Sequence, residues 1–166
     1  MTAALQSFEQ LVQYLLDNKI PYRIDEPRQL VELPSQNASL PTNVFVRWEK
    51  HVPFLQIVQF MIEGVPAGRV RELETAIVRA DNALEVGGFG FDHERLRCYY
   101  RLTIPVFPHD GINPSTLIQL VQGVVRTAED YRDAFQKIVA GTPGEQIAAV
   151  YADVVAQRQA RAAATS

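Results

Sequence analysis

The chain has 166 residues, 47% of them hydrophobic, and sixteen basic against nineteen acidic side chains leave it with a net charge of -3. Its length is that of one domain with a core large enough to fold without a disulfide or metal. Its hydrophobic content excludes disorder of the whole chain. The mild acidity argues against a nucleic-acid-binding protein, whose basic side chains normally cluster.

The cysteine content and the N-terminal residues indicate the cellular compartment in which the protein folds. The single cysteine, Cys98, cannot form an internal disulfide, so an oxidising compartment would offer the fold nothing. The first residues lack a basic segment followed by a continuous apolar one, and no window holds 18 uninterrupted apolar residues. We therefore expect a cytoplasmic protein with no signal peptide and no membrane partner.

The predicted elements begin with a helix from Ala3 to Asn18, which has an apolar stripe at helical spacing and stops before Pro21. Three strands follow, at Arg28–Leu33, Thr42–Trp48 and Pro53–Ile62. The third strand is apolar on both alternating sets of side chains. This pattern predicts a strand covered on both faces, or one face covered by a partner.

A second helix is predicted over Arg69–Leu84, followed by two strands at Phe89–Asp92 and Arg95–Ile104. The last of these alternates cleanly between apolar and polar or charged side chains. One of its faces should therefore lie in the core, and the other in water or at an interface.

The remaining chain is predicted to be helical. Asn113 with Pro114 is a typical N-cap and first helical residue, and the helix should run to Ala140 with Gly141 after its end. A capping-box pattern beginning at Thr142 predicts a terminal helix. We expect an α+β domain over residues 1–141, with a mostly antiparallel five-stranded sheet and helices on one face. Residues 142–166 should add a helix and a frayed tail, within that domain or as a docking extension.

No catalytic constellation emerges from the sequence. The three histidines, His51, His93 and His109, sit in predicted turns without metal-ligand spacing. Cys98 falls on the apolar side of its strand, as a small hydrophobe would. The glycine-rich stretch Gly87–Gly90 precedes a strand rather than a helix, so it predicts a turn and not a phosphate loop. We expect no enzyme, no cofactor and no metal.

Arginine and aromatic side chains share the polar face of the last predicted strand. Two interpretations stay open: a solvated face with arginine stems lying over the aromatic rings, or a binding face, because these residue types are enriched at interface hot spots. Arg95, Arg97 and Arg101 share this strand face. The residues expected to bind a partner are Arg47, Trp48, Arg97, Tyr99 and Arg101, with apolar contacts from Phe54, Phe60 and Tyr131.

The helix from Pro114 is predicted to be about 40 Å long, longer than a small sheet is wide. Its second half, which carries Tyr131 and Phe135, would then overhang the sheet. That overhang could form a dimer or partner surface, or the terminal helix could fold back to cover it. The sequence leaves both arrangements open.

Six segments between Phe8 and Val139 resemble the YbjN family, within the type III secretion chaperone-like superfamily. The segments are Phe8-x-x-Leu11-x-x-Tyr14-Leu15, Val44–Trp48, Leu55–Val58, Ala80–Leu84, Gly88–Asp92 and Arg97–Arg101.

The resemblance implies a helix–sheet–helix domain, often a homodimer, with a non-enzymatic protein-binding role as a chaperone, adaptor or regulator. The terminal helix after Gly141 would be an addition to the family pattern. We expect a client polypeptide as partner, and neither nucleic acid nor membrane. The alternatives are a small-molecule-sensing regulator or an enzyme with a scattered histidine and carboxylate site.

Overall fold

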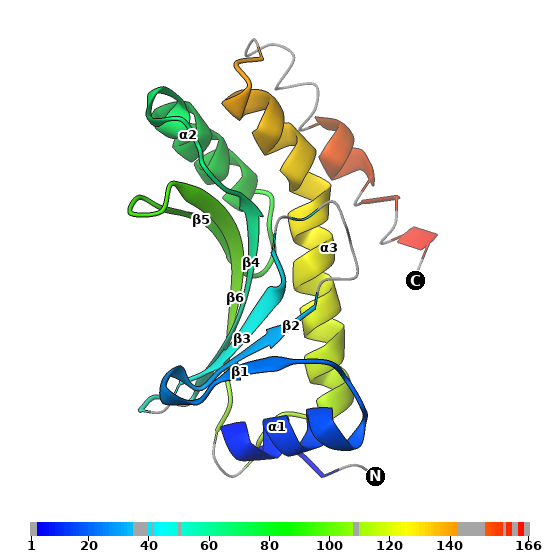
Figure 1. The fold of residues 1–166 in the computed structure, drawn as a ribbon. Helices are drawn as coiled ribbons and strands as arrows, with labels where there is room; N and C mark the ends of the chain where they lie inside the picture. The colour runs from blue at the N-terminus through cyan, green and yellow to red at the C-terminus, as the bar shows by residue number, and fades with distance from the viewer. Residues whose placement is uncertain are drawn as a thin grey trace.

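The structure is a computed structural model that describes residues 3–34, 40, 42–49, 51–107, 110–142, 152–157, 159–160 and 163–164. A bent antiparallel sheet carries the long helix α3 along one of its sides, with α1 near one end of that helix and α2 near the other (Figure 1). The helices are α1 (Phe8–Asp17), α2 (Val70–Asp81) and α3 (Pro114–Val139), with short 3-10 turns at Glu26–Arg28 and Ala67–Arg69. The strands are β1 (Arg23–Asp25), β2 (Leu30–Leu33), β3 (Val44–Trp48), β4 (Phe54–Ile62), β5 (Gly88–Asp92) and β6 (Arg97–Pro105).

The sheet has six strands in the order β1-β2-β3-β4-β6-β5, and every neighbouring pair is antiparallel. The α+β class and the antiparallel sheet predicted from the sequence are confirmed, but the prediction of five strands is wrong. The additional strand is β1, whose three residues are too short and too polar to show an alternating pattern. It becomes a strand only because β2 lies beside it.

Four predicted strands begin one or two residues later than expected, and for β2 and β6 the reason is a turn of the backbone just before the strand. Before β2, the side chain of Asp25 caps a 3-10 turn and Gln29 adopts a left-handed conformation with φ 48°. Before β6, Leu96 is left-handed with φ 49°, so Arg95 lies in the β5–β6 turn and not on the strand. The first helix also starts later, at Phe8, because Ser7 supplies its N-cap and Leu5 instead pairs with Ile112.

The ends of α3 follow their capping residues. Asn113 accepts a hydrogen bond from the Ser115 amide at 2.9 Å, and Pro114 occupies the first helical position. At the other end, Gly141 takes φ 85°, which a residue with a side chain rarely adopts. Both capping predictions are confirmed.

The core fills the space between the sheet and the helices, and its centre is aromatic. The ring of Phe89 on β5 lies about 5 Å, centroid to centroid, from the rings of Tyr100, Tyr131 and Phe135. Leu55, Ile57 and Met61 supply the inner face of β4, all fully buried. This packing places the apolar stripe of α3 against the sheet.

The second half of α3 does not offer a free apolar overhang. Tyr131, Phe135 and Ile138 are buried, and α2 packs beside this part of the helix. Residues 152–157 are helical, and Val154 joins the same core (Figure 1). The predicted capping box at 142–145 lies mostly outside the described residues. Within the described part of the chain, no helix is long and apolar enough to cross a membrane.

Candidate functional site

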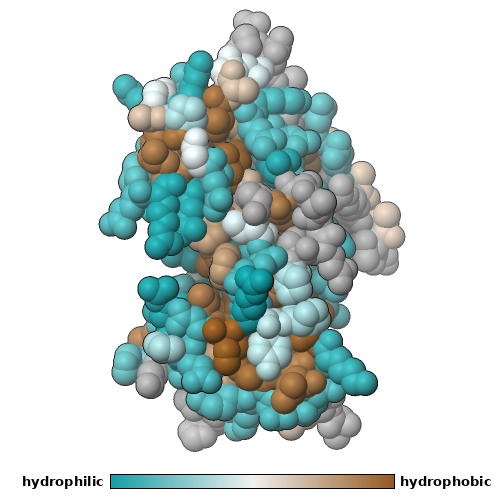
Figure 2. All heavy atoms as spheres, in the orientation of Figure 1, coloured by the Kyte–Doolittle hydropathy of each residue, from teal (hydrophilic) through white to brown (hydrophobic). Residues whose placement is uncertain are grey.

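The side of the sheet opposite α3 is uncovered in the described structure, and its central strands carry aromatic and arginine side chains. Figure 1 draws no helix against this side, and Figure 2 shows the molecular outline indented there, at mid-height on the left. We call this surface the outer face. It is formed by Phe45 and Arg47 of β3, Gln56, Val58 and Phe60 of β4, and Arg97, Tyr99 and Arg101 of β6.

Strand pairing brings three aromatic rings into one row across the outer face. Phe60 pairs with Tyr99, and their ring centroids are 6.0 Å apart in an edge-on arrangement. Phe45 lies on the other side of Phe60, 5.6 Å away and also edge-on. Such contacts between neighbouring strands stabilise a sheet and hold the rings in fixed orientations.

Tyr99 leans over β5 because that strand has no side chain beneath it. A Cβ atom built on Gly90 would collide with the Tyr99 ring. Gly90 pairs directly with Tyr99, so the glycine is what allows the ring to lie close to the sheet.

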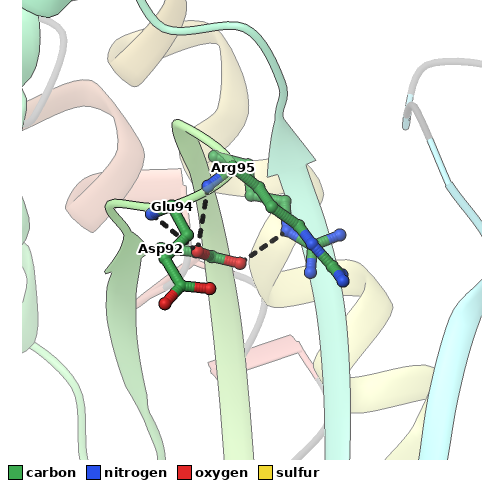
Figure 3. A network of polar contacts seen from close by, with 4 residues as sticks. Asp92, Glu94 and Arg95 are labelled. Atoms are coloured by element: carbon green, nitrogen blue, oxygen red, sulfur yellow. Dashed lines mark hydrogen bonds and ion pairs between the residues drawn. The ribbon is translucent and has the colours of Figure 1, made fainter.

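Asp92 connects the β5–β6 turn to the outer face. One carboxylate oxygen accepts hydrogen bonds from the Glu94 and Arg95 amides, both at 3.1 Å (Figure 3). The other accepts from Nε of Arg97 at 3.0 Å. The Arg97 hydrogen bond is the main reason that the pKa of Asp92 lies below its usual value, which keeps the carboxylate charged.

Arg97 is held by two contacts at once. While its Nε donates to Asp92, its guanidinium carbon lies 3.7 Å from the centroid of the Phe60 ring. Its side chain is 17% exposed, so the guanidinium is largely surrounded by protein. A planar guanidinium group can stack on an aromatic ring and at the same time donate hydrogen bonds in its own plane.

The other two arginines of the outer face are less constrained. Arg101 lies 5.9 Å from the Tyr99 ring and forms no ion pair with any of the described residues. Arg47 pairs with Glu49 at 3.0 Å. An open hollow of about 300 Å³ lies between the arginines, lined by Gln56, Val58, Phe60, Asp92, Arg97, Tyr99 and Arg101. This arrangement can contact an apolar side chain and an anionic group together.

Three solved structures share this architecture. YbjN from E. coli is 13% identical, with a TM-score of 0.54 over 83% of this chain and 93% of that one. The HopA1–SchA chaperone–effector complex contains a chain that is 12% identical, with a TM-score of 0.55 over 76% of this chain and 94% of that one. A chain of the ExsC–ExsE complex is also 12% identical, with a TM-score of 0.55 over 79% and 96%.

The chain has the YbjN and type III secretion chaperone-like fold. This confirms the fold expected from the family resemblance. No family model and no curated protein matches the sequence.

Within this chaperone-like fold, most of the predicted binding residues meet on the outer face. Arg47, Phe60, Arg97, Tyr99 and Arg101 lie together there, as described above. Phe54 belongs to the same alternating set of β4 but lies at its far end, 40% exposed.

Three predicted residues do not join the face. Trp48 points to the opposite side of the sheet, in the set of Val44 and Val46, and lines a separate hollow of about 410 Å³ beside the start of α1. Tyr131 is 1% exposed and packs on Phe89 in the core. Arg95 lies in the β5–β6 turn, because β6 begins two residues later than the alternating pattern predicted.

The polar side chains with catalytic potential remain separate in the chaperone-like fold. His93 pairs with Glu74 at 2.9 Å on the surface, His51 is exposed beside α1, and His109 lies outside the described residues. Burial raises the pKa of Cys98 to about 12, so its thiol stays neutral. Of the residues that the structure describes, no three histidine, cysteine or acidic side chains gather as metal ligands would.

Sequence reasoning missed Asp92 and Gly90, both of which shape the outer face. The sequence places Asp92 at the end of a predicted strand and His93 in a predicted turn, and assigns neither residue to the binding face. The available signal was the acidic residue at the end of one strand of a hairpin, opposite an arginine at the start of the next. Gly90 carried a signal too, since a glycine inside a strand often marks the close approach of another group.

Proposed function

We propose that this protein is a non-enzymatic, chaperone-like protein that binds an extended segment of a client polypeptide on its outer face. The observation that carries the proposal is the uncovered row formed by Phe45, Phe60 and Tyr99, flanked by arginines. Aromatic and arginine side chains are those that most often contribute binding energy at protein interfaces.

The organisation of the row supports binding rather than simple solvation. Arg97 is held by Asp92 and Phe60, and Tyr99 packs edge-on against Phe60 in the space that Gly90 leaves open. Side chains that are already ordered lose less entropy when a partner binds.

The comparisons support the same class of function. The HopA1–SchA structure is a chaperone–effector complex by its own description, and the present chain shares that fold. Homodimerisation and a cytoplasmic location stay predictions from the sequence. Light scattering on the purified protein would test the dimer directly.

The proposed function can be tested by comparing one substitution at two places. Val58 lies at the centre of the outer face, and Val78 is 63% exposed on α2. Val58→Lys and Val78→Lys introduce the same charge and stem, and circular dichroism would verify that both variants are folded. Binding would be measured by fluorescence anisotropy with a panel of labelled, unstructured peptides of varied charge.

The expected result is peptide binding that Val58→Lys removes and Val78→Lys preserves. Hydrogen exchange of the bound protein should show additional protection on β3, β4 and β6. If no peptide of any composition binds, or if both variants bind like the wild type, the outer face is not a client site.

A further inference from the structure

We propose that the segment bound on the outer face is acidic, with two carboxylates that flank an apolar side chain at alternate positions of an extended chain. This inference rests on the proposed function and specifies the chemistry of the client. Its physical basis is the distribution of charge and aromatic surface along β6.

The hollow on the outer face is positive although the whole chain is not. Its lining holds two guanidinium groups, Arg97 and Arg101, against the single carboxylate of Asp92, whereas the chain has a net charge of -3. Of the Arg97 guanidinium, Asp92 contacts the Nε atom, and none of the described acidic side chains forms an ion pair with Arg101. The terminal amino groups of both arginines can therefore receive carboxylates from outside.

The spacing along β6 determines the pattern of the client. One face of β6 carries Arg97, Tyr99 and Arg101 at alternate positions. The Cα atoms of the two arginines are therefore about 13 Å apart along the strand, with the aromatic row between them. An extended client chain has the same repeat. Acidic residues at its positions i and i+4 would reach the two arginines while the side chain at i+2 lies over Tyr99 and Val58.

A peptide fits this surface better than a nucleic acid. The positive region is small, because Glu32 of β2 and Glu49, immediately after β3, lie beside it, and Asp92 of β5 lines its other edge. Nucleic-acid binding normally depends on many phosphate contacts along an extended basic surface. The outer face offers two arginines and three aromatic rings within an acidic border. This small surface is suited to a short peptide segment that carries both acidic and apolar side chains.

The test uses three labelled twelve-residue peptides that differ only in a central motif. The first carries Asp-Thr-Leu-Thr-Asp, the second Asn-Thr-Leu-Thr-Asn, and the third Asp-Asp-Leu-Thr-Thr, which has the composition of the first with the wrong spacing. The protein variants are Arg101→Gln and Arg79→Gln, since Arg79 is exposed on α2 and does not line the hollow. A labelled duplex DNA serves as a competing anion.

The first peptide should bind the wild type about tenfold more tightly than the third, which loses one charge-assisted hydrogen bond, and more tightly still than the second, which loses both. Arg101→Gln should remove the preference over the third peptide and reduce the preference over the second, and Arg79→Gln should leave both unchanged. Equal binding of all three peptides, still abolished by Val58→Lys, would overturn the acidic client while the proposed function stands. Displacement of the first peptide by equimolar DNA would also overturn it, and binding of no peptide would reject both proposals.

Discussion

Arg97 and Phe60 form the tightest contact between a charge and a ring in the described structure, with 3.7 Å between the guanidinium carbon and the ring centroid. The two residues lie on neighbouring strands, and the same guanidinium donates to Asp92 at 3.0 Å. A lysine at this position could approach either the ring or the carboxylate but would lack the planar fork that serves both. The contact therefore depends on arginine in particular.

Arg97→Lys is expected to lower the free energy of unfolding by about 1 kcal/mol, through loss of the stacked, hydrogen-bonded geometry. Urea denaturation measures the change. Arg101→Lys is the matched control, because Arg101 is exposed and lies 5.9 Å from its ring, so its effect should stay within about 0.5 kcal/mol. Equal losses in the two variants would show that the contact with Phe60 adds nothing to stability.

Asp92→Asn should lower the free energy of unfolding by an amount that depends on pH. The Arg97 hydrogen bond lowers the pKa of Asp92, so the folded state binds its proton less readily than the unfolded chain does. The stabilisation is therefore fully present above the unfolded pKa of about 3.9 and is lost as the pH falls through the lower folded value. Urea titrations from pH 3 to pH 7 should show the wild type more stable at neutral pH, with the difference shrinking in acid. A difference that stays constant with pH would contradict this account.

Asp81 at the end of α2 should show the opposite pH dependence. Desolvation raises its pKa, although its carboxylate accepts a hydrogen bond from the Phe89 amide at 2.8 Å. The stabilisation is present below the unfolded pKa and is lost as the pH rises through the higher folded value. Asp81→Asn, which keeps the acceptor without the charge, should be more stable than wild type at pH 7 and equal to it in acid.

Asp81→Ala separates the hydrogen bond from the charge in the same experiment. It leaves the Phe89 amide without its acceptor, which should cost about 1 kcal/mol relative to Asp81→Asn. If alanine and asparagine gave the same stability at pH 7, the hydrogen bond to β5 would have no energetic role.

Cys98 should be unreactive in the folded protein. Its side chain is fully buried, and burial together with the nearby Asp81 charge raises its pKa to about 12. A thiol-reactive disulfide reagent at pH 8 should modify it only as fast as the protein unfolds. The control is the double variant Val78→Cys, Cys98→Ala, whose exposed thiol should react within the mixing time. Rapid modification of Cys98 without denaturant would mean that the core beneath β6 is accessible.

Alanine at two glycines should change stability in opposite directions. Gly123 lies inside α3 with open space around its Cβ position, so Gly123→Ala should stabilise the protein by about 0.5–1 kcal/mol. Gly90→Ala should destabilise it, because the added methyl group would displace the Tyr99 ring. Thermal unfolding of the two variants, analysed together, gives the signs. A stabilising Gly90→Ala would show that Tyr99 has another place to lie.

Local patterns were sufficient for the parts of the fold that depend on neighbours in sequence. The alternation along 97–104 correctly separated the buried side chains, such as Cys98 and Tyr100, from Tyr99 and Arg101. The residues Asn113, Pro114 and Gly141 correctly marked the two ends of α3. These features follow from the period of a strand and from backbone preferences at helix ends, both of which are local.

Pairing and register were decided only in three dimensions. β1 is a strand because β2 is its neighbour, and Phe60 faces Tyr99 because the register of β4 against β6 shifts only beyond that pair. Tyr131 is buried because α3 lays it on Phe89. By contrast, Trp48 faces away from Arg47 because adjacent residues of a strand point to opposite sides, which the strand period already implies.

The sequence by itself therefore determined which side chains share a face of each strand and where the main helices stop. The tertiary structure decided which strands touch and which apolar residues are covered. It also decided that Asp92, Arg97 and Phe60 meet at one point. The physical reason is that periodicity is set by bonds along the chain, whereas these contacts form between segments whose association depends on the whole core.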